Sequence, residues 1–171
     1  MKPMRRNWFW ILLVLTIVLL LFGIGWMIFS VNSRLTGTEY QFQVDAVLAA
    51  AKIENGGEPL TDPGKAVVAE YEGRRAVVVP ANYAALSSYL RKDAASPLFL
   101  SIQPEKSLKL TVCGEAEIYA MPEEGNGDVV LIQMTTQGRT FRIRTDGGNQ
   151  WSSLLRCCME GTYHDANIPL D

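Results

Sequence analysis

The sequence is poor in the residue types from which catalytic and metal sites are usually built. Its 171 residues include one histidine, His164, and three cysteines, Cys113, Cys157 and Cys158. Adjacent cysteines rarely reach disulfide geometry, and they lack the spacing of zinc ligands. A single bridge from Cys113 to either neighbour stays open. The composition otherwise predicts no disulfide framework, no metal and no cofactor.

Catalytic motifs are also lacking around these residues. No glycine-rich elbow or orienting motif surrounds any of the cysteines or the histidine. A thiol nucleophile needs a base within hydrogen-bond reach, and nothing in the local sequence builds such a pair. We therefore expect a noncatalytic protein. The alternative that stays open is a membrane-anchored hydrolase or thiol enzyme that uses a Cys/His pair.

An excess of positive charge is missing from most of the chain. Residues 35–171 carry twelve basic and eighteen acidic side chains. Nucleic-acid binding relies on Lys and Arg to neutralise phosphates, so this acidic part gives no support for a nucleic-acid partner.

Charge of either sign is missing from residues 8–29, which are almost entirely apolar. A helix of that length covers roughly 33 Å, about the thickness of a bilayer core. Trp8 and Trp10 mark one end of the run and Trp26 the other, as is typical of headgroup-level indoles. A cleaved signal peptide is the rival interpretation, but its apolar region is usually shorter. We predict a transmembrane helix over residues 8–30.

The charges that flank this helix predict its orientation. Lys2, Arg5 and Arg6 precede it, whereas Arg34 is the nearest basic residue after it. The positive-inside rule places residues 1–7 in the cytoplasm and the C-terminal domain outside the plasma membrane. The expected partners are the lipid bilayer and an envelope or membrane protein.

A short linker (31–37) and one α+β domain (38–171) are expected after the span. Thr38 and Gln41 have the spacing of a capping box, which predicts a helix that begins there. Short strands are predicted over residues 98–121, and an Asn-Gly turn at Asn126. In all we expect about seven strands of mainly antiparallel sheet and two or three helices.

A repeat at an offset of 65 residues organises this domain. Residues 65–92 and 129–160 each predict two strands, a turn and a helix. The identical pairs are Gly73/Gly138, Arg74/Arg139, Ser87/Ser152, Ser88/Ser153, Leu90/Leu155 and Arg91/Arg156. We interpret the match as one ββα unit used twice around a shared core, although generic hairpin–helix patterning would give a similar match.

Two sets of residues are candidates for binding. Arg142 and Arg144 are two apart on a predicted strand and project from one face, with Arg139 nearby. They could grip a phosphate, a carboxylate or an acidic partner, or serve as a solvated strand face. Val77 and Val79 belong to a strand that is apolar on both sides. If that strand were uncovered, it would be a partner-binding face.

These predictions favour a single-pass protein whose noncatalytic domain binds or assembles close to the membrane. A bitopic sensor or regulator is a further alternative. Only seven residues precede Trp8, so a signal would have to pass through contacts between spans.

Overall fold

The structure, a computed structural model, begins with one long helix. It describes residues 4–54, 63–90, 96–97, 102–147, 149–162 and 165–170. The first helix, α1 (Met4–Glu54), contains the whole of the predicted linker 31–37. The expected irregular linker is therefore wrong, as is a helix start at Thr38. The segment has no proline, and a lone glycine costs only about 1 kcal/mol in a helix that is already propagating.

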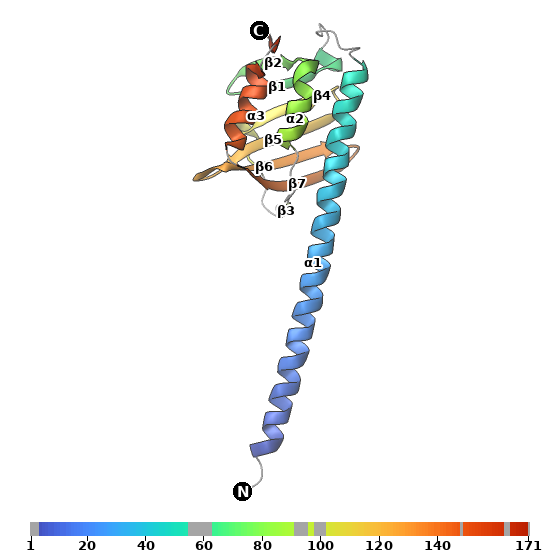
Figure 1. The fold of residues 1–171 in the computed structure, drawn as a ribbon, viewed down its shortest axis with the longest axis vertical. Helices are drawn as coiled ribbons and strands as arrows, with labels where there is room; N and C mark the ends of the chain where they lie inside the picture. Colours follow the sequence, from blue (N-terminus) through green and yellow to red (C-terminus); the bar gives the residue numbers. More distant parts are fainter. Residues whose placement is uncertain are drawn as a thin grey trace. The chain divides into compact units, whose positions relative to one another are not determined.

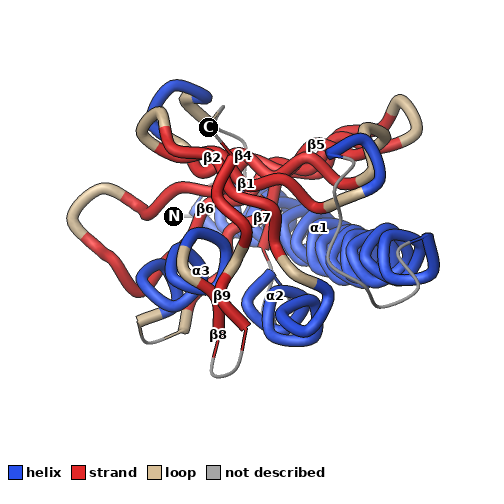
Figure 2. Tube along the Cα trace, turned by 90° about the horizontal axis from the view of Figure 1, so that it is seen from above, coloured by secondary structure: helices blue, strands red, loops and turns tan. Residues whose placement is uncertain are grey.

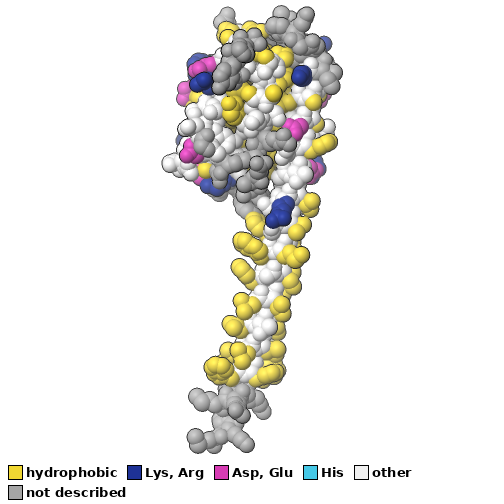
Figure 3. Space-filling model, in the orientation of Figure 1, with side chains coloured by type: hydrophobic (Ala, Val, Ile, Leu, Met, Phe, Trp, Pro, Cys, Tyr) yellow, Lys and Arg dark blue, Asp and Glu magenta, His cyan; other side chains and the backbone are white. Residues whose placement is uncertain are grey.

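The chain forms two compact units, residues 1–35 and 36–171. In the first, one helix is long and apolar enough to cross a membrane, with a mean hydropathy of 2.9 in its best window. Apolar side chains cover the visible face of this part of α1 (Figure 3). Trp8, Trp10 and Trp26 are all exposed there. The side chains of Lys2, Arg5 and Arg6 lie outside the described residues.

The second unit is built on an eight-stranded sheet in which every neighbouring pair is antiparallel. The sheet order is β10-β2-β1-β4-β5-β6-β7-β3. Its strands are β1 (Val67–Tyr71), β2 (Arg74–Val78), β3 (Ser96–Pro97), β4 (Leu108–Val112), β5 (Ala116–Glu123), β6 (Asn126–Thr136), β7 (Arg139–Asp146) and β10 (Ile168–Leu170). A separate two-stranded sheet joins β8 (Gly161–Thr162) to β9 (Asp165–Ala166). The α+β class and the mainly antiparallel sheet are confirmed, with very short strands at both edges.

Three helices cover one face of this sheet. They are the part of α1 from Thr36 onward, α2 (Tyr83–Leu90) and α3 (Gln150–Met159), and they lie on the same side of it (Figures 1 and 2). Short 3-10 turns, η1 (Pro63–Lys65), η2 (Pro80–Asn82) and η3 (Pro104–Lys106), begin with proline. Pro80 leads directly into α2, as its fixed φ favours.

The core lies between the three helices and the sheet, because alternate residues of each strand point toward the helices. The helices contribute Tyr40, Val44, Leu48, Ala51, Tyr83, Leu86, Leu90, Leu154, Cys157 and Cys158. Central strands supply Leu108, Leu110, Ile118, Ile132, Met134 and Ile143. The Tyr40 hydroxyl donates a hydrogen bond of 2.9 Å to the Leu90 carbonyl, which joins α1 to the end of α2.

Both copies of the repeat fold as a hairpin followed by a helix. The turns at Glu72-Gly73 and Gln137-Gly138 have matching positive φ values, 49° and 76° against 48° and 73°. Two positive φ values in succession suit the right-handed twist of a hairpin. The helices match less well, because Leu90 is fully buried whereas its equivalent, Leu155, is partly exposed.

Two details differ from the predicted strand pattern. The β5–β6 turn lies at Glu124-Gly125, two residues before the predicted Asn-Gly turn at Asn126. A register shift after Pro122 accompanies this change, since proline has no N–H for the ladder. The strand predicted at 98–102 falls almost entirely on residues 98–101, which lie outside the described residues.

A C-terminal segment ties the two repeats together. Strand β10 pairs with β2, and Asn167 lies just before it. The buried Asn167 amide donates to the carbonyls of Cys157 and Cys158 at 2.8 and 2.7 Å. Its oxygen accepts from the Val79 N–H at 3.1 Å and from the Asn82 amide at 2.8 Å. One side chain thus joins the end of α3 to the start of η2.

Candidate functional site

The predicted arginine cluster is engaged by the protein's own side chains. Arg142 donates to the Gln133 side chain at 3.0 Å on the face of the sheet away from the helices. Arg144 forms a two-point ion pair with Glu123, at 2.9 and 2.8 Å. This hydrogen-bonded guanidinium lowers the pKa of the Glu123 carboxyl. The two side chains share a face as expected, but Arg142 is held by Gln133 of the adjacent strand β6, and Arg144 by Glu123 of β5, one strand further away.

Arg139 is directed elsewhere. It forms a two-point pair with Glu39 of α1, and its guanidinium lies 5.5 Å from the centre of the Phe141 ring. The three arginines therefore do not converge on one point. Their observed contacts pair strands within the sheet and attach α1 to it.

Val77 and Val79 do not form an uncovered face, which was the condition for partner binding there. Val77 is 1% exposed and Val79 is 7% exposed. Val77 packs with Ala66 and Val68, and the partly buried Ile168 of β10 covers this small cluster. The C-terminal strand was not predicted from sequence, so its cover over β2 was missed.

The thiols of α3 are poorly suited to nucleophilic chemistry. Cys157 and Cys158 are both fully buried. Burial raises the pKa of Cys157 to about 11 and raises the pKa of Cys158 well above its ordinary value. Neutral thiols are weak nucleophiles, so this setting fits two small core residues. Cys113 is partly exposed, and none of the three cysteines forms a disulfide. His164 lies outside the described residues.

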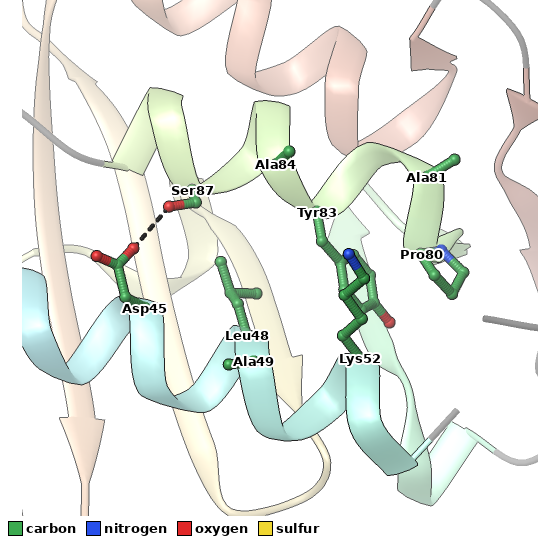
Figure 4. Close-up of a pocket in the computed structure, with 9 residues that line it drawn as sticks. All are labelled: Asp45, Leu48, Ala49, Lys52, Pro80, Ala81, Tyr83, Ala84 and Ser87. Atoms are coloured by element: carbon green, nitrogen blue, oxygen red, sulfur yellow. Dashed lines mark hydrogen bonds between the residues drawn. The ribbon is translucent and has the colours of Figure 1, made fainter. Parts of the chain in front are cut away.

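A groove lies between α1 and the segment formed by η2 and α2 (Figure 4). Its volume is about 440 Å³. Leu48 and Tyr83, each 4% exposed, form an apolar floor. Its walls carry Asp45, Ala49, Lys52, Pro80, Ala81, Ala84 and Ser87. Ala49 of α1 faces the short side chains of Ala81, Ala84 and Ser87, which leaves space between the two sides.

The two charged residues of the groove come from α1 and lie seven positions apart. Seven residues are about two helical turns, so Asp45 and Lys52 share a side of α1, about 10 Å apart. Ser87 of α2 donates a hydrogen bond of 2.8 Å to Asp45, which fixes one end of the groove (Figure 4). The groove thus presents an anion, an apolar middle and a cation in that order.

Sequence reasoning missed this groove, although part of its signal was present. The helical stripe of Tyr40, Val44 and Leu48 predicted which side of α1 is buried, and this is confirmed. The same periodicity places Asp45 and Lys52 beside that stripe. What the sequence did not contain was the neighbour, because α2 is about 40 residues away along the chain.

Side-chain clusters suited to metals are not found in the part of the chain that the structure describes. Comparison with known proteins gives no family for this chain: no family model, no curated protein and no solved structure matches it. The class that the fold defines is an α+β domain that follows an N-terminal apolar helix.

Proposed function

We propose that the chain is a single-pass membrane protein whose noncatalytic α+β domain works outside the plasma membrane as a binding or assembly module. One observation carries the anchor: residues 8–29 are uncharged, and this part of α1 buries none of its apolar side chains against the protein. Such a surface is unstable in water and stable in lipid.

The orientation rests on charge. Lys2, Arg5 and Arg6 precede the apolar segment, and the domain beyond it is acidic. Basic flanks favour the cytoplasmic side, which leaves the domain outside. Six residues, 30–35, lie between Phe29 and Thr36, where the second unit begins. The domain therefore acts within roughly 25 Å of the bilayer even if that stretch were fully extended.

The chemistry of the α1–α2 groove favours a binding role. The groove pairs one carboxylate and one ammonium with alanine walls, and Ser87 holds the Asp45 carboxylate in place. The buried α3 thiols have raised pKa values, which argues against their use as nucleophiles.

Cysteine labelling in intact cells tests the anchor and its orientation. Cys113→Ala removes the partly exposed native thiol, and Glu124→Cys or Lys2→Cys then adds one reporter. A membrane-impermeant maleimide is expected to label the Glu124→Cys variant in intact cells. It should label the Lys2→Cys variant only after permeabilisation.

Each outcome is informative. Labelling of the Lys2→Cys variant in intact cells reverses the orientation. Loss of residue 2 from the mature chain identifies a cleaved signal peptide instead of an anchor. Either result removes the proposal.

A further inference from the structure

Phe42 is an exposed aromatic residue on an otherwise well-covered domain. Among the described residues from Thr36 onward, it is the one large hydrophobic side chain that stays exposed, at 69%. A single exposed hydrophobic residue is ordinary on a protein surface. Phe42 is of interest as part of a binding surface, because it lies one helical turn from the α1–α2 groove.

The groove and Phe42 form one continuous strip along α1. Phe42, Asp45, Ala49 and Lys52 are spaced by three, four and three residues, which places them on one side of the helix. The strip is about 15 Å long, or three helical turns. We call it, with the groove wall of α2, the α1–α2 strip.

The shape of the α1–α2 strip suits a helix. Ala81 of η2 and Ala84 of α2 line one side of the groove with short side chains, and Ala49 does the same on α1 (Figure 4). Packed helices approach to 8–10 Å between axes where contact residues are small. An aromatic anchor beside a small-walled groove is also the arrangement that recognises an amphipathic helix.

We infer that the α1–α2 strip docks an amphipathic helix of a different protein. That helix carries a basic side chain opposite Asp45, an acidic one opposite Lys52 and apolar residues between them. This inference rests on the proposed binding function and adds the chemistry of the partner. Ser87 holds the Asp45 carboxylate in place, so the acidic end is pre-positioned for a cation.

The charges also argue against a second copy of this chain. Two copies can be related by a twofold axis that runs parallel to the strip. In a symmetric parallel pair, each residue of the strip faces its own equivalent, so Asp45 would meet Asp45 and Lys52 would meet Lys52. Like charges across an interface are unfavourable, which leaves a partner with a different sequence.

Site-specific photocrosslinking of the full chain in its native membrane tests the inference. A benzophenone amino acid is placed at Ala49, in the strip, or at Thr140, an exposed residue of β7, as the matched control. The crosslinked segment is identified by mass spectrometry. We expect the Ala49 position to capture one segment of another protein, with a basic and an acidic residue seven positions apart.

Two substitutions sharpen the test. Lys52→Glu is expected to lower the yield at least fivefold, and replacing the partner's acidic residue by lysine should restore it. Phe42→Ala should also lower the yield at least fivefold. Both side chains are exposed, so neither variant disturbs the core, and continued protection of Cys158 from maleimide checks the fold.

Three results would overturn the inference: capture of a second copy, capture of a segment without the charge pair, or a yield at Ala49 no higher than at Thr140. None of them bears on the anchor. If the Glu124→Cys variant is labelled in intact cells while crosslinking fails, the membrane topology stands and the helix-docking strip does not.

Discussion

Replacing Asn167 by alanine removes four hydrogen bonds that join the end of α3 to the segment between β2 and η2. The side chain is 7% exposed, so water does not readily replace these bonds. Two buried donors, the Val79 N–H and the Asn82 amide, lose the oxygen that they share. The carbonyls of Cys157 and Cys158 lose their side-chain donor.

The size of the effect follows from these lost partners. A buried polar group left without its partner costs about 1–3 kcal/mol. With two donors affected, we expect Asn167→Ala to lower the free energy of unfolding by about 3 kcal/mol. For a domain of this size, that loss lowers the melting temperature by roughly 10 °C.

The assay uses a reporter that lies inside the domain. Cys158 is fully buried, so brief maleimide pulses at increasing urea measure the fraction of unfolded domain in the full chain. The apolar part of α1 does not contribute to this signal. Asn126→Ala is the matched control, because Asn126 is exposed and accepts one bond of 3.2 Å from the Asp128 N–H.

A third variant separates hydrogen bonding from loss of volume. Asn167→Asp has nearly the same shape, but it sets a carboxylate oxygen against the two carbonyls of α3. We expect it to be at least as destabilising as alanine at pH 7. The variant should recover part of its stability at low pH, because the protonated acid can donate one bond. Equal urea midpoints for Asn167→Ala and Asn126→Ala would refute the reasoning.

Three further predictions concern exposure, backbone strain and charge. In the native chain, Ellman's reagent should modify Cys113 within minutes, while the two adjacent thiols of α3 react only on unfolding; rapid reaction of all three would contradict their burial. Gly138→Ala should cost about 1–2 kcal/mol in urea unfolding because φ is +73° there, whereas Gly127→Ala, at a position without a positive φ, should cost less. Glu123→Gln should reduce stability at neutral pH, and the difference from wild type should shrink as pH falls below the ordinary pKa of 4.5 and vanish only below the lowered pKa of this carboxyl in the fold; a difference independent of pH would rule out the ion pair as its source.

Local patterns predicted most of the individual elements. In β7, the alternation of Phe141 and Ile143 with polar residues matches its buried and exposed faces, and the spacing of Leu154 and Cys158 matches the inner side of α3. Glu72-Gly73 and Gln137-Gly138 predicted the two hairpin turns. These signals depend only on residues close together in the chain, so they can be read from a single sequence.

Contacts between distant segments could not be predicted in the same way. Arg139 was a candidate for ligand binding or for a solvated strand face, and its pairing with Glu39, 100 residues earlier, was not predicted. Asn167 lies in a short polar tail, and nothing local marks it as the buried link between α3 and η2. The prediction of a linker at 31–37 was also wrong, because none of its residues prevents a helix that has already formed from continuing.

The order of the sheet has a consequence for how the domain comes apart. Strand β3, from the first half of the domain (36–171), lies outside β7 of its second half, while β10 of the second half lies outside β2 of the first. Each half of the domain contributes the edge strand next to the other half, so the two halves are interlocked. Neither half retains a finished sheet when the other opens, and melting should be a single all-or-none event instead of two successive ones.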